Sequence, residues 1–273
     1  IIVTIIIWWA VYAASLPGKL TVAFFDVGQG DSIYIESPTG VEIIIDGGPD
    51  SSVLRNLGRV MDPFDRNIDA LIETHPDADH VSGFIDVLRR YEIKTFIEPG
   101  IPKDTQTALT LLEEVDQENA AHLIARRGMW LELGGGVELH VLYPDFDAST
   151  LSESKSNEGG IVMRLVYGET SVLFMADVSK KIEERLVELE GENLDSDILK
   201  VGHHGSKTST GENFLATVLP AAAVISVGDY NRYGHPTEEV LSTLSSQNVK
   251  TLRTDQAGMI VFESNGEEFT RIR

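Results

Sequence analysis

Residues 71–80 read LIETHPDADH, an apolar run that leads directly into a group of polar side chains. Pro76 ends the predicted strand and holds the following residues in a tight loop. The polar side chains are His75, Asp77, Asp79 and His80. Imidazole nitrogens and carboxylate oxygens are ligands that first-row transition metals prefer. The segment therefore predicts a metal site at the end of a buried strand. The alternative is a polar surface loop in which Asp79 caps the next helix.

Histidines and an aspartate also follow three other apolar runs. They are Asp177 after SVLFMA, His203 and His204 after DILKV, and His235 after AAVISV and a short loop. Loops at the ends of strands are where a rigid sheet usually carries its functional residues. We therefore expect these side chains to converge with the 75–80 loop. One imidazole of the adjacent pair would bind a metal, and the other would support it or contact a substrate.

Three aspartates lie beside glycines at the ends of the first predicted strands. They are Asp26, Asp31 and Asp46. One interpretation is that they orient His80 or the metal loop, because carboxylates beside a metal commonly hold its ligands in place. The other is that they are turn residues whose carboxylates accept hydrogen bonds from backbone amides. Asp46 follows three isoleucines, so we expect it to be buried and to need hydrogen-bond partners.

The composition is that of a globular protein, and it limits the possible functions. Of the 273 residues, 42% are hydrophobic, 43 are acidic and 22 are basic, which gives a formal charge of −21. A broad basic surface for duplex DNA is therefore not expected, and any contact with nucleic acid has to be local. The chain contains no cysteine, which excludes disulfides and thiolate-ligated metals.

Candidates for a local phosphate contact lie close to the histidine pair. Ser206 and Lys207 supply a hydroxyl group and an ammonium group that suit a phosphate oxygen. Four basic residues are nearest to the motifs in sequence and could line a narrow groove. They are Arg164, Lys200, Lys207 and Arg232.

The order of predicted elements indicates the fold class. Strands and helices alternate on both sides of a strand-rich middle at 121–175. This order predicts one layered α/β domain over residues 19–273, rather than a helical bundle or a β-barrel. The acidic stretch 144–160 is rich in small residues and is predicted to be a mobile loop.

Residues 1–18 differ from the rest of the chain. The run from Ile1 to Ala14 is apolar apart from one threonine. It predicts the end of a transmembrane helix or the core of a signal peptide, and the alternative is a buried strand. The domain that follows is therefore expected to be membrane-attached or exported, on the extracytoplasmic side.

Seven longer sequence segments around these residues resemble a known family. They are FFDVGQGDS (24–32), IIIDGGP (43–49), THPDADHVSG (74–83), SNEGGIVMRL (156–165), LFMADV (173–178), LKVGHHGSKTS (199–209) and SVGDYNRYGHP (226–236). Their order resembles the metallo-β-lactamase superfamily, and within it the C-terminal domain of the ComEC family of DNA-uptake channels and its free-standing relatives. The resemblance implies a four-layer αββα sandwich with a metal site at one edge. In that family the domain follows transmembrane helices and is thought to degrade one strand of incoming DNA.

The resemblance also implies a ligand set for one or two divalent ions, manganese or zinc. His75 and Asp77 would bind the first metal, Asp79 and His80 the second, and Asp177 would bridge them. His203 would complete the second site, with His204 as the rival for that role.

Three departures from the superfamily pattern affect this ligand set. Asp77 stands where the superfamily has histidine, which shifts the preference from zinc towards manganese or magnesium. Residues 156–160 contain no histidine for the first metal, and only Asn157 matches the ComEC-like pattern there. We therefore expect the first metal to be weak or absent. Ala176 replaces the more usual glycine before Asp177.

The implied reaction is metal-dependent hydrolysis of single-stranded DNA or another phosphodiester. Asp79 would orient or deprotonate the attacking water, and His204 or His235 would stabilise the developing charge. Ser206, Lys207 and Asn157 would bind substrate. The partner would be the membrane-channel portion of the same or another protein. Two alternatives stay open: a hydrolase of a small ester, amide or nucleotide, and a non-catalytic scaffold that retains the fold.

Overall fold

The computed structural model describes residues 18–273. The expectation of a membrane-derived segment at Ile1 to Ala14 lies outside the described residues. Within residues 18–273, none of the helices has both the length and the apolar character needed to cross a bilayer.

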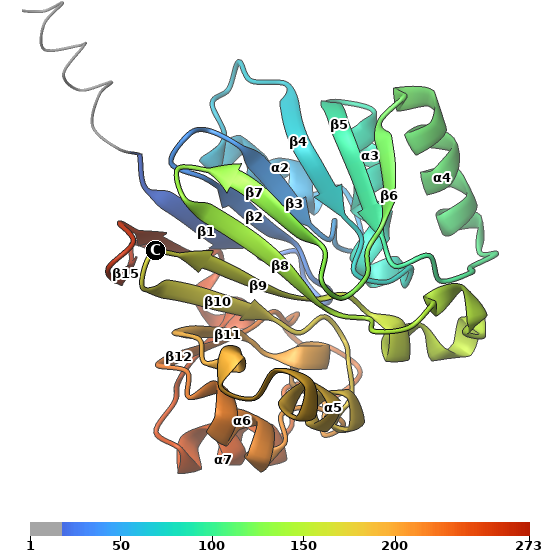
Figure 1. The fold of residues 1–273 in the computed structure, drawn as a ribbon. Coiled ribbons are helices and arrows are strands. Elements are labelled where there is room, and N and C mark those ends of the chain that lie inside the picture. The colour runs from blue at the N-terminus through green and yellow to red at the C-terminus, as the bar shows by residue number, and fades with distance from the viewer. Residues whose placement is uncertain (1–17) are drawn as a thin grey trace, which may run out of the picture.

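The fold is built on two mixed β-sheets (Figure 1). The first sheet has the order β15-β14-β1-β2-β3-β4-β5-β6. Its strands are β1 (Leu20–Phe24), β2 (Ile33–Glu36), β3 (Glu42–Ile45), β4 (Asn67–Ile72), β5 (Glu92–Glu98), β6 (Ala121–Ile124), β14 (Ile260–Ser264) and β15 (Phe269–Arg271). The second sheet has the order β13-β12-β11-β10-β9-β8-β7. Its strands are β7 (Trp130–Gly134), β8 (Val137–Tyr143), β9 (Val162–Tyr167), β10 (Thr170–Phe174), β11 (Ile198–Lys200), β12 (Ala222–Ile225) and β13 (Lys250–Arg253).

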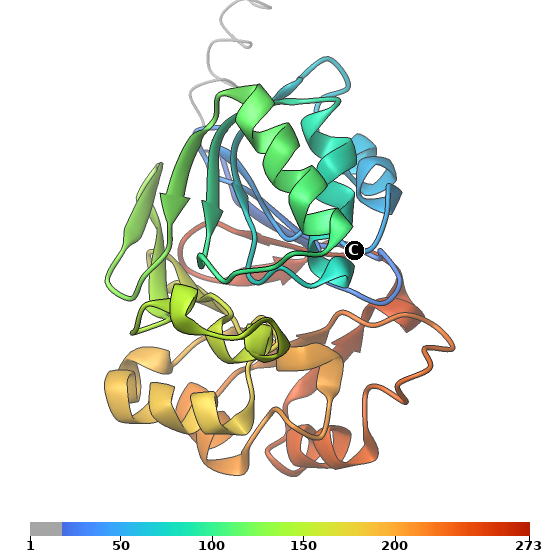
Figure 2. The same cartoon turned by 90° about the vertical axis from the view of Figure 1, so that its right-hand side faces the viewer.

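Helices cover the outer face of each sheet (Figure 2). The first sheet is covered by α2 (Ser52–Val60), α3 (Ala78–Leu88) and α4 (Gln106–Glu118), and the second by α5 (Lys180–Glu190), α6 (Glu212–Val218) and α7 (Glu238–Ser246). The short elements are α8 (Thr254–Ala257), η1 (Ala148–Thr150), η2 (Glu153–Gly159), η3 (Gly191–Leu194) and η4 (Gly202–Gly205). A third apolar core fills the space between the sheets, where Phe24 of β1 meets Phe174 of β10. The predicted αββα sandwich is therefore confirmed.

The segment 144–160, predicted to be a mobile loop, contains the short 3-10 helices η1 and η2. The side chains of Ala148 and Ser156 are buried. Small polar residues favour loops when they are exposed, and here tertiary contacts bury two small residues of the segment.

The topology brings the ends of several strands to one edge of the sandwich. β3, β4, β5 and β6 run parallel in the first sheet, and β10 to β13 run parallel in the second. The loops after β3, β4, β10 and β11 carry Asp46, His75, Asp177 and the histidine pair, in that order. Polar residues that are far apart in sequence therefore meet where the two sheets present their loops.

Gly83 fixes the helix α3 against the loop that contains Asp46. A Cβ atom at this position would lie 2.0 Å from the carbonyl oxygen of Gly47 and 2.7 Å from that of Asp50. We expect Gly83→Ala to destabilise the fold by about 3 kcal/mol, because both contacts are with backbone atoms. Urea unfolding measures this free energy.

A matched control is available in the helix α2. A Cβ at Gly58 would meet no atom within 4 Å, so Gly58→Ala should raise stability by about 0.5–1 kcal/mol through helix propensity. Equal effects of the two substitutions would contradict the close packing of α3.

Candidate metal centre

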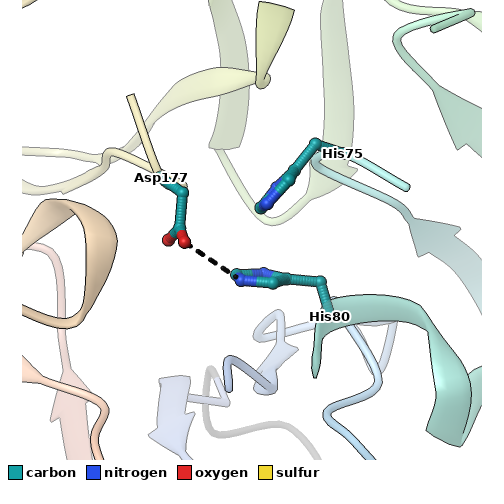
Figure 3. Close-up of side chains that lie close together, drawn as sticks. All are labelled: His75, His80 and Asp177. Atoms are coloured by element: carbon teal, nitrogen blue, oxygen red, sulfur yellow. Dashed lines mark ion pairs between the residues drawn. The ribbon is translucent and has the colours of Figure 1, made fainter. Parts of the chain in front are cut away.

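Three buried imidazoles converge on one buried carboxylate. His75 and His80 lie with their ring centroids 4.1 Å apart and face Asp177 (Figure 3). The Nε2 atom of His80 lies 3.5 Å from Oδ2 of Asp177, and Nε2 of His204 lies at the same distance from that oxygen. His75 follows β4 of the first sheet and His80 lies in α3, whereas Asp177 and His204 follow β10 and β11 of the second sheet.

Each of these imidazoles is held through its Nδ1 atom. The partners are Thr74 Oγ1 for His75 at 3.0 Å, Asp46 Oδ2 for His80 at 2.8 Å, and the carbonyl oxygen of Ser226 for His204 at 2.9 Å. All three Nε2 atoms, together with Oδ1 of Asp177, are buried and have no hydrogen-bond partner in the described part of the chain. Metal-binding histidines typically have one ring nitrogen held in this way and the other facing the ion. The side chains thus fit a divalent cation.

Asp46 holds His80 in its orientation towards Asp177. Its backbone is left-handed, with φ of 59°, and its side chain is fully buried. One carboxylate oxygen accepts a hydrogen bond from Thr74 N at 2.8 Å, and the other accepts from Thr74 Oγ1 at 2.7 Å and meets His80 Nδ1. The structure therefore gives Asp46 the hydrogen-bond partners that a buried carboxylate needs, and it places this residue where it orients His80.

Asp79 completes the group of donors. It lies in the first turn of α3, and its Oδ2 atom is 3.6 Å from Nε2 of His204. Two ligands of a tetrahedral ion with bond lengths near 2.1 Å are about 3.4 Å apart. The separations of 3.5 and 3.6 Å among these atoms match that spacing. We refer to His75, His80, His204, Asp79 and Asp177 together as the donor cluster.

The charges in the donor cluster stabilise one another. Burial lowers the pKa of His204, but the carboxylates of Asp177 and Asp31 outweigh burial and raise it to about 10. Burial likewise lowers the pKa of His80, and Asp177 and Asp46 raise it well above its ordinary value. Burial raises the pKa of Asp177, but His204 and His80 bring it well below its ordinary value. Without a metal, protons on the imidazoles therefore compensate the buried carboxylates.

The structure distinguishes the two adjacent histidines. Both have left-handed backbones, with φ of 47° for His203 and 52° for His204. The resulting turn buries His204 to 2% exposure, while the side chain of His203 is 30% exposed and lies 3.8 Å from Asp177. His204, the alternative that the sequence left open, therefore presents a buried Nε2 atom to Asp177, and His203 lies at the solvent side of the cluster. Ala176 also has a positive φ, 46°, a backbone conformation that glycine adopts most readily.

Asp77 faces a different set of partners from the rest of the loop. It occupies the N-cap position of α3 without capping it. Its Oδ1 atom accepts hydrogen bonds from Lys103 Nζ at 3.0 Å and Ser156 Oγ at 2.8 Å. The sequence offered no signal for Lys103, because it lies in the loop after β5. Asn157, predicted to bind substrate, neighbours Ser156, and its Oδ1 atom lies 3.3 Å from Oγ of Ser156.

Of the remaining aspartates, only Asp31 lies at the cluster. It is buried, its Oδ1 atom is 3.4 Å from Nδ1 of His204, and its Oδ2 accepts a hydrogen bond from Lys200. Burial raises the pKa of Asp31, but Lys200 and His204 hold it well below its usual range. Asp26 is exposed and accepts only a long hydrogen bond from Gly28 N at 3.4 Å. The expectation that Asp26 orients the site is therefore corrected, because its carboxylate lies in a surface turn.

The predicted basic groove is also corrected. Lys200 is fully buried in its ion pair with Asp31. The guanidinium group of Arg164 is bound to the carbonyl oxygen of Asp195. Lys207 and Arg232 are exposed. A basic side chain on a strand can be buried in an ion pair with an acidic residue far away in the sequence. Its closeness to a motif in the sequence does not show whether its charge is exposed.

His235 lies at the open side of the cluster. Its ring centroid is 5.7 Å from that of His203, and its Nδ1 atom is buried without a partner in the described residues. Ser206 is buried and accepts a hydrogen bond from Thr208 Oγ1, which also lies 3.2 Å from Nδ1 of His203. The structure therefore brings Ser206, His203 and His235 to one side of the cluster, and Lys207 to the neighbouring surface.

Comparison with known proteins identifies related sequences. The model described as "Metallo-beta-lactamase superfamily" matches residues 25–229. The chain is 32% identical over 268 residues to ComE operon protein 3 of Bacillus subtilis (strain 168), and the alignment covers 90% of this chain and 33% of that protein. It is 31% identical over 245 residues to Competence protein ComA of Neisseria gonorrhoeae, covering 89% and 32% of the two chains. The chain thus spans about a third of the length of these relatives.

A solved structure shows the same fold at low sequence identity. It is Igni18, described as a metallo hydrolase from the archaeon Ignicoccus hospitalis, with a TM-score of 0.57 and 15% identity. The alignment covers 90% of this chain and all of that one. Because the alignment covers most of this chain, the shared fold includes both sheets.

Proposed function

The chain belongs to the metallo-β-lactamase superfamily, and on this premise we propose that it hydrolyses phosphodiester bonds of single-stranded DNA with one or two divalent ions, manganese or zinc. The superfamily consists in general of metal-dependent hydrolases, and this chain is related to competence proteins. The observation that carries the proposal is the donor cluster, in which three anchored imidazoles point buried Nε2 atoms towards Asp177, and these atoms have no hydrogen-bond partner within residues 18–273.

The ligands that we propose are His80, His204, Asp79 and Asp177, with His75 adjoining them. A bound divalent ion supplies positive charge that acidifies water and polarises a phosphoryl oxygen. Asp46 and the carbonyl oxygen of Ser226 keep two imidazoles in the orientation that presents Nε2. Their role is to fix the site before substrate arrives, which avoids reorganisation during the reaction.

Asp79 is the best-placed residue to handle a proton. Its side chain is 37% exposed, whereas that of Asp177 is 5% exposed. Burial raises the pKa of Asp79, but His204 and His80 lower it below its ordinary value. The residue is therefore an ionised acceptor at neutral pH, open on one side to solvent. We propose that it orients the attacking water and accepts its proton.

The open side of the cluster suits a phosphate group. His203 and His235 lie there, and Lys207 is exposed nearby. These groups would stabilise negative charge that develops on the phosphoryl oxygens, with Ser206 and Asn157 as further contacts. A protein with a net charge of −21 repels free DNA. Delivery by a membrane channel, in the same or a partner protein, would overcome this by raising the local concentration.

The names of the relatives support the choice of substrate and place. Two of them are called a competence protein and a protein of the ComE operon. We propose that this domain acts during DNA uptake, attached to the membrane or exported, on the extracytoplasmic side.

The test is manganese-dependent cleavage of single-stranded DNA. We expect Asp79→Ala to lower the rate about 100-fold or more, which is the usual contribution of a positioned general base. Asp26→Ala, at an exposed carboxylate that accepts only a long hydrogen bond from Gly28 N, is the matched control and should cleave at the rate of the unaltered protein. Equal rates for Asp79→Ala and the unaltered protein would refute the proposed role. Thioesters, lactams and small phosphodiesters in the same assay test the alternative of a small-molecule hydrolase.

A further inference from the structure

We propose that the ammonium group of Lys103 replaces the first metal ion of the superfamily, so that this chain binds a single divalent ion tightly. The inference rests on the proposed function only in taking the donor cluster as a metal site. It specifies which of the two expected metal sites this chain uses, and which residue takes the place of the ion at the other site.

The first-metal donors of this chain are incomplete. The resemblance assigns His75 and Asp77 to that metal, and Nε2 of His75 lies 3.9 Å from Oδ2 of Asp77. The third ligand of the superfamily would come from residues 156–160, where this chain offers Ser156 and Asn157 but no imidazole. The hydroxyl of Ser156 donates its proton to Asp77 at 2.8 Å. It therefore acts as a hydrogen-bond donor to this carboxylate.

Lys103 already supplies the positive charge that Asp77 needs. Its Nζ atom donates to Oδ1 of Asp77 at 3.0 Å, and it also lies 3.8 Å from Oε1 of Glu153. The side chain of Lys103 is only 16% exposed, so little water screens its charge. A divalent ion at Asp77 would be placed beside a fixed ammonium group, and the repulsion between the two cations would weaken its binding.

The surroundings hold Lys103 in place. It lies in the loop between β5 and α4, beside a cavity of about 640 Å³. Pro76 of the metal loop and Glu153 of η2 line the same cavity. The ammonium group thus lies between the carboxylates of Asp77 and Glu153.

The carboxylates of the second metal site, within residues 18–273, have no lysine or arginine beside them. Among residues 18–273, Asp79 forms its ion pair with His204, and Asp177 forms its ion pairs with His80, His203 and His204. Neither carboxylate is paired with a lysine or an arginine. A metal can displace the protons of histidines, whereas an ion that binds at Asp77 would have to move the Lys103 side chain away from its two carboxylate partners. The two halves of the expected site therefore differ in what they can bind.

Manganese titration of the metal-free full chain, followed by native mass spectrometry and elemental analysis, tests the inference without any substrate. We expect one tight equivalent for the unaltered protein, with a second at least 100-fold weaker. Lys103→Met should strengthen the second equivalent at least tenfold, and Lys103→Arg should not. Lys155→Met is the matched control, because Lys155 is 55% exposed and pairs with Glu158; it should leave both affinities unchanged.

Several outcomes would overturn the inference. Binding of two manganese ions by the unaltered protein with affinities within tenfold of each other would do so. A second ion that binds Lys103→Met no more tightly than it binds the unaltered protein would also do so. If Lys103→Met does not fold, Asp77→Asn decides: the tight equivalent should change less than threefold, and its loss would show that Asp77 is a ligand. The absence of any tight equivalent would refute the metal site itself. Tight binding of one ion without DNA cleavage would refute only the proposed substrate.

Discussion

Replacing Asp177 with asparagine is expected to abolish tight divalent-metal binding and to lower hydrolysis about 1000-fold, which corresponds to about 4 kcal/mol of transition-state stabilisation. Oδ2 of Asp177 lies 3.5 Å from Nε2 of both His80 and His204, so it is the donor that both imidazoles share. Asparagine keeps the shape but removes the negative charge. Isothermal titration with manganese measures the first effect, and cleavage of single-stranded DNA measures the second.

The control for this substitution is Asp26→Asn. Asp26 is also an aspartate that follows an apolar strand of the sandwich, but it is exposed in a surface turn. We expect its metal affinity and activity to stay within twofold of the unaltered protein. Tight metal binding by Asp177→Asn would contradict the assignment of the donor cluster.

The second large effect is the dependence of metal affinity on pH. In the metal-free protein the pKa of His204 is raised to about 10 and that of His80 is raised well above its ordinary value. An ion that binds to their Nε2 atoms must release both protons. Apparent affinity should therefore rise about 100-fold per pH unit between pH 6 and 7, since each released proton contributes about tenfold. Titration in buffers of different ionisation enthalpy counts the protons released.

The same protonation predicts the stability of the metal-free protein. The pKa of His204 is higher in the folded state, about 10, than its ordinary value of 6.5. The stabilisation from its protonation is therefore complete below pH 6.5 and is lost as the pH rises towards 10. We expect the melting temperature of the metal-free protein to fall over this range, and that of the manganese-loaded protein to fall less. A metal affinity that does not vary with pH would contradict both expectations.

Much of the fold and part of the site follow from local patterns. The loop after β4 could be recognised because four potential ligands crowd into HPDADH behind an apolar run, and the layered α/β class followed from the alternation of strands and helices. The ligand roles of His75, Asp79, His80 and Asp177 stay predictions, although the structure places these side chains together.

What could not be predicted depends on contacts between distant residues. Lys103 is 26 residues from Asp77, and Ser156 is 79 residues from it. Lys200 meets Asp31 across 169 residues. The choice between His203 and His204 depends on two consecutive left-handed residues, a backbone state that few residues adopt and that no side-chain pattern announces.

The donor cluster draws on both halves of the sandwich: Asp79 and His80 lie in α3, which packs on the first sheet, and Asp177 and His204 follow β10 and β11 of the second. A bound ion would therefore act as a cross-link between the halves, and unfolding would have to release it. Resistance to heat should then increase with the logarithm of the free-ion concentration. Melting curves recorded in a series of divalent salts would rank the ions by affinity before any substrate is known.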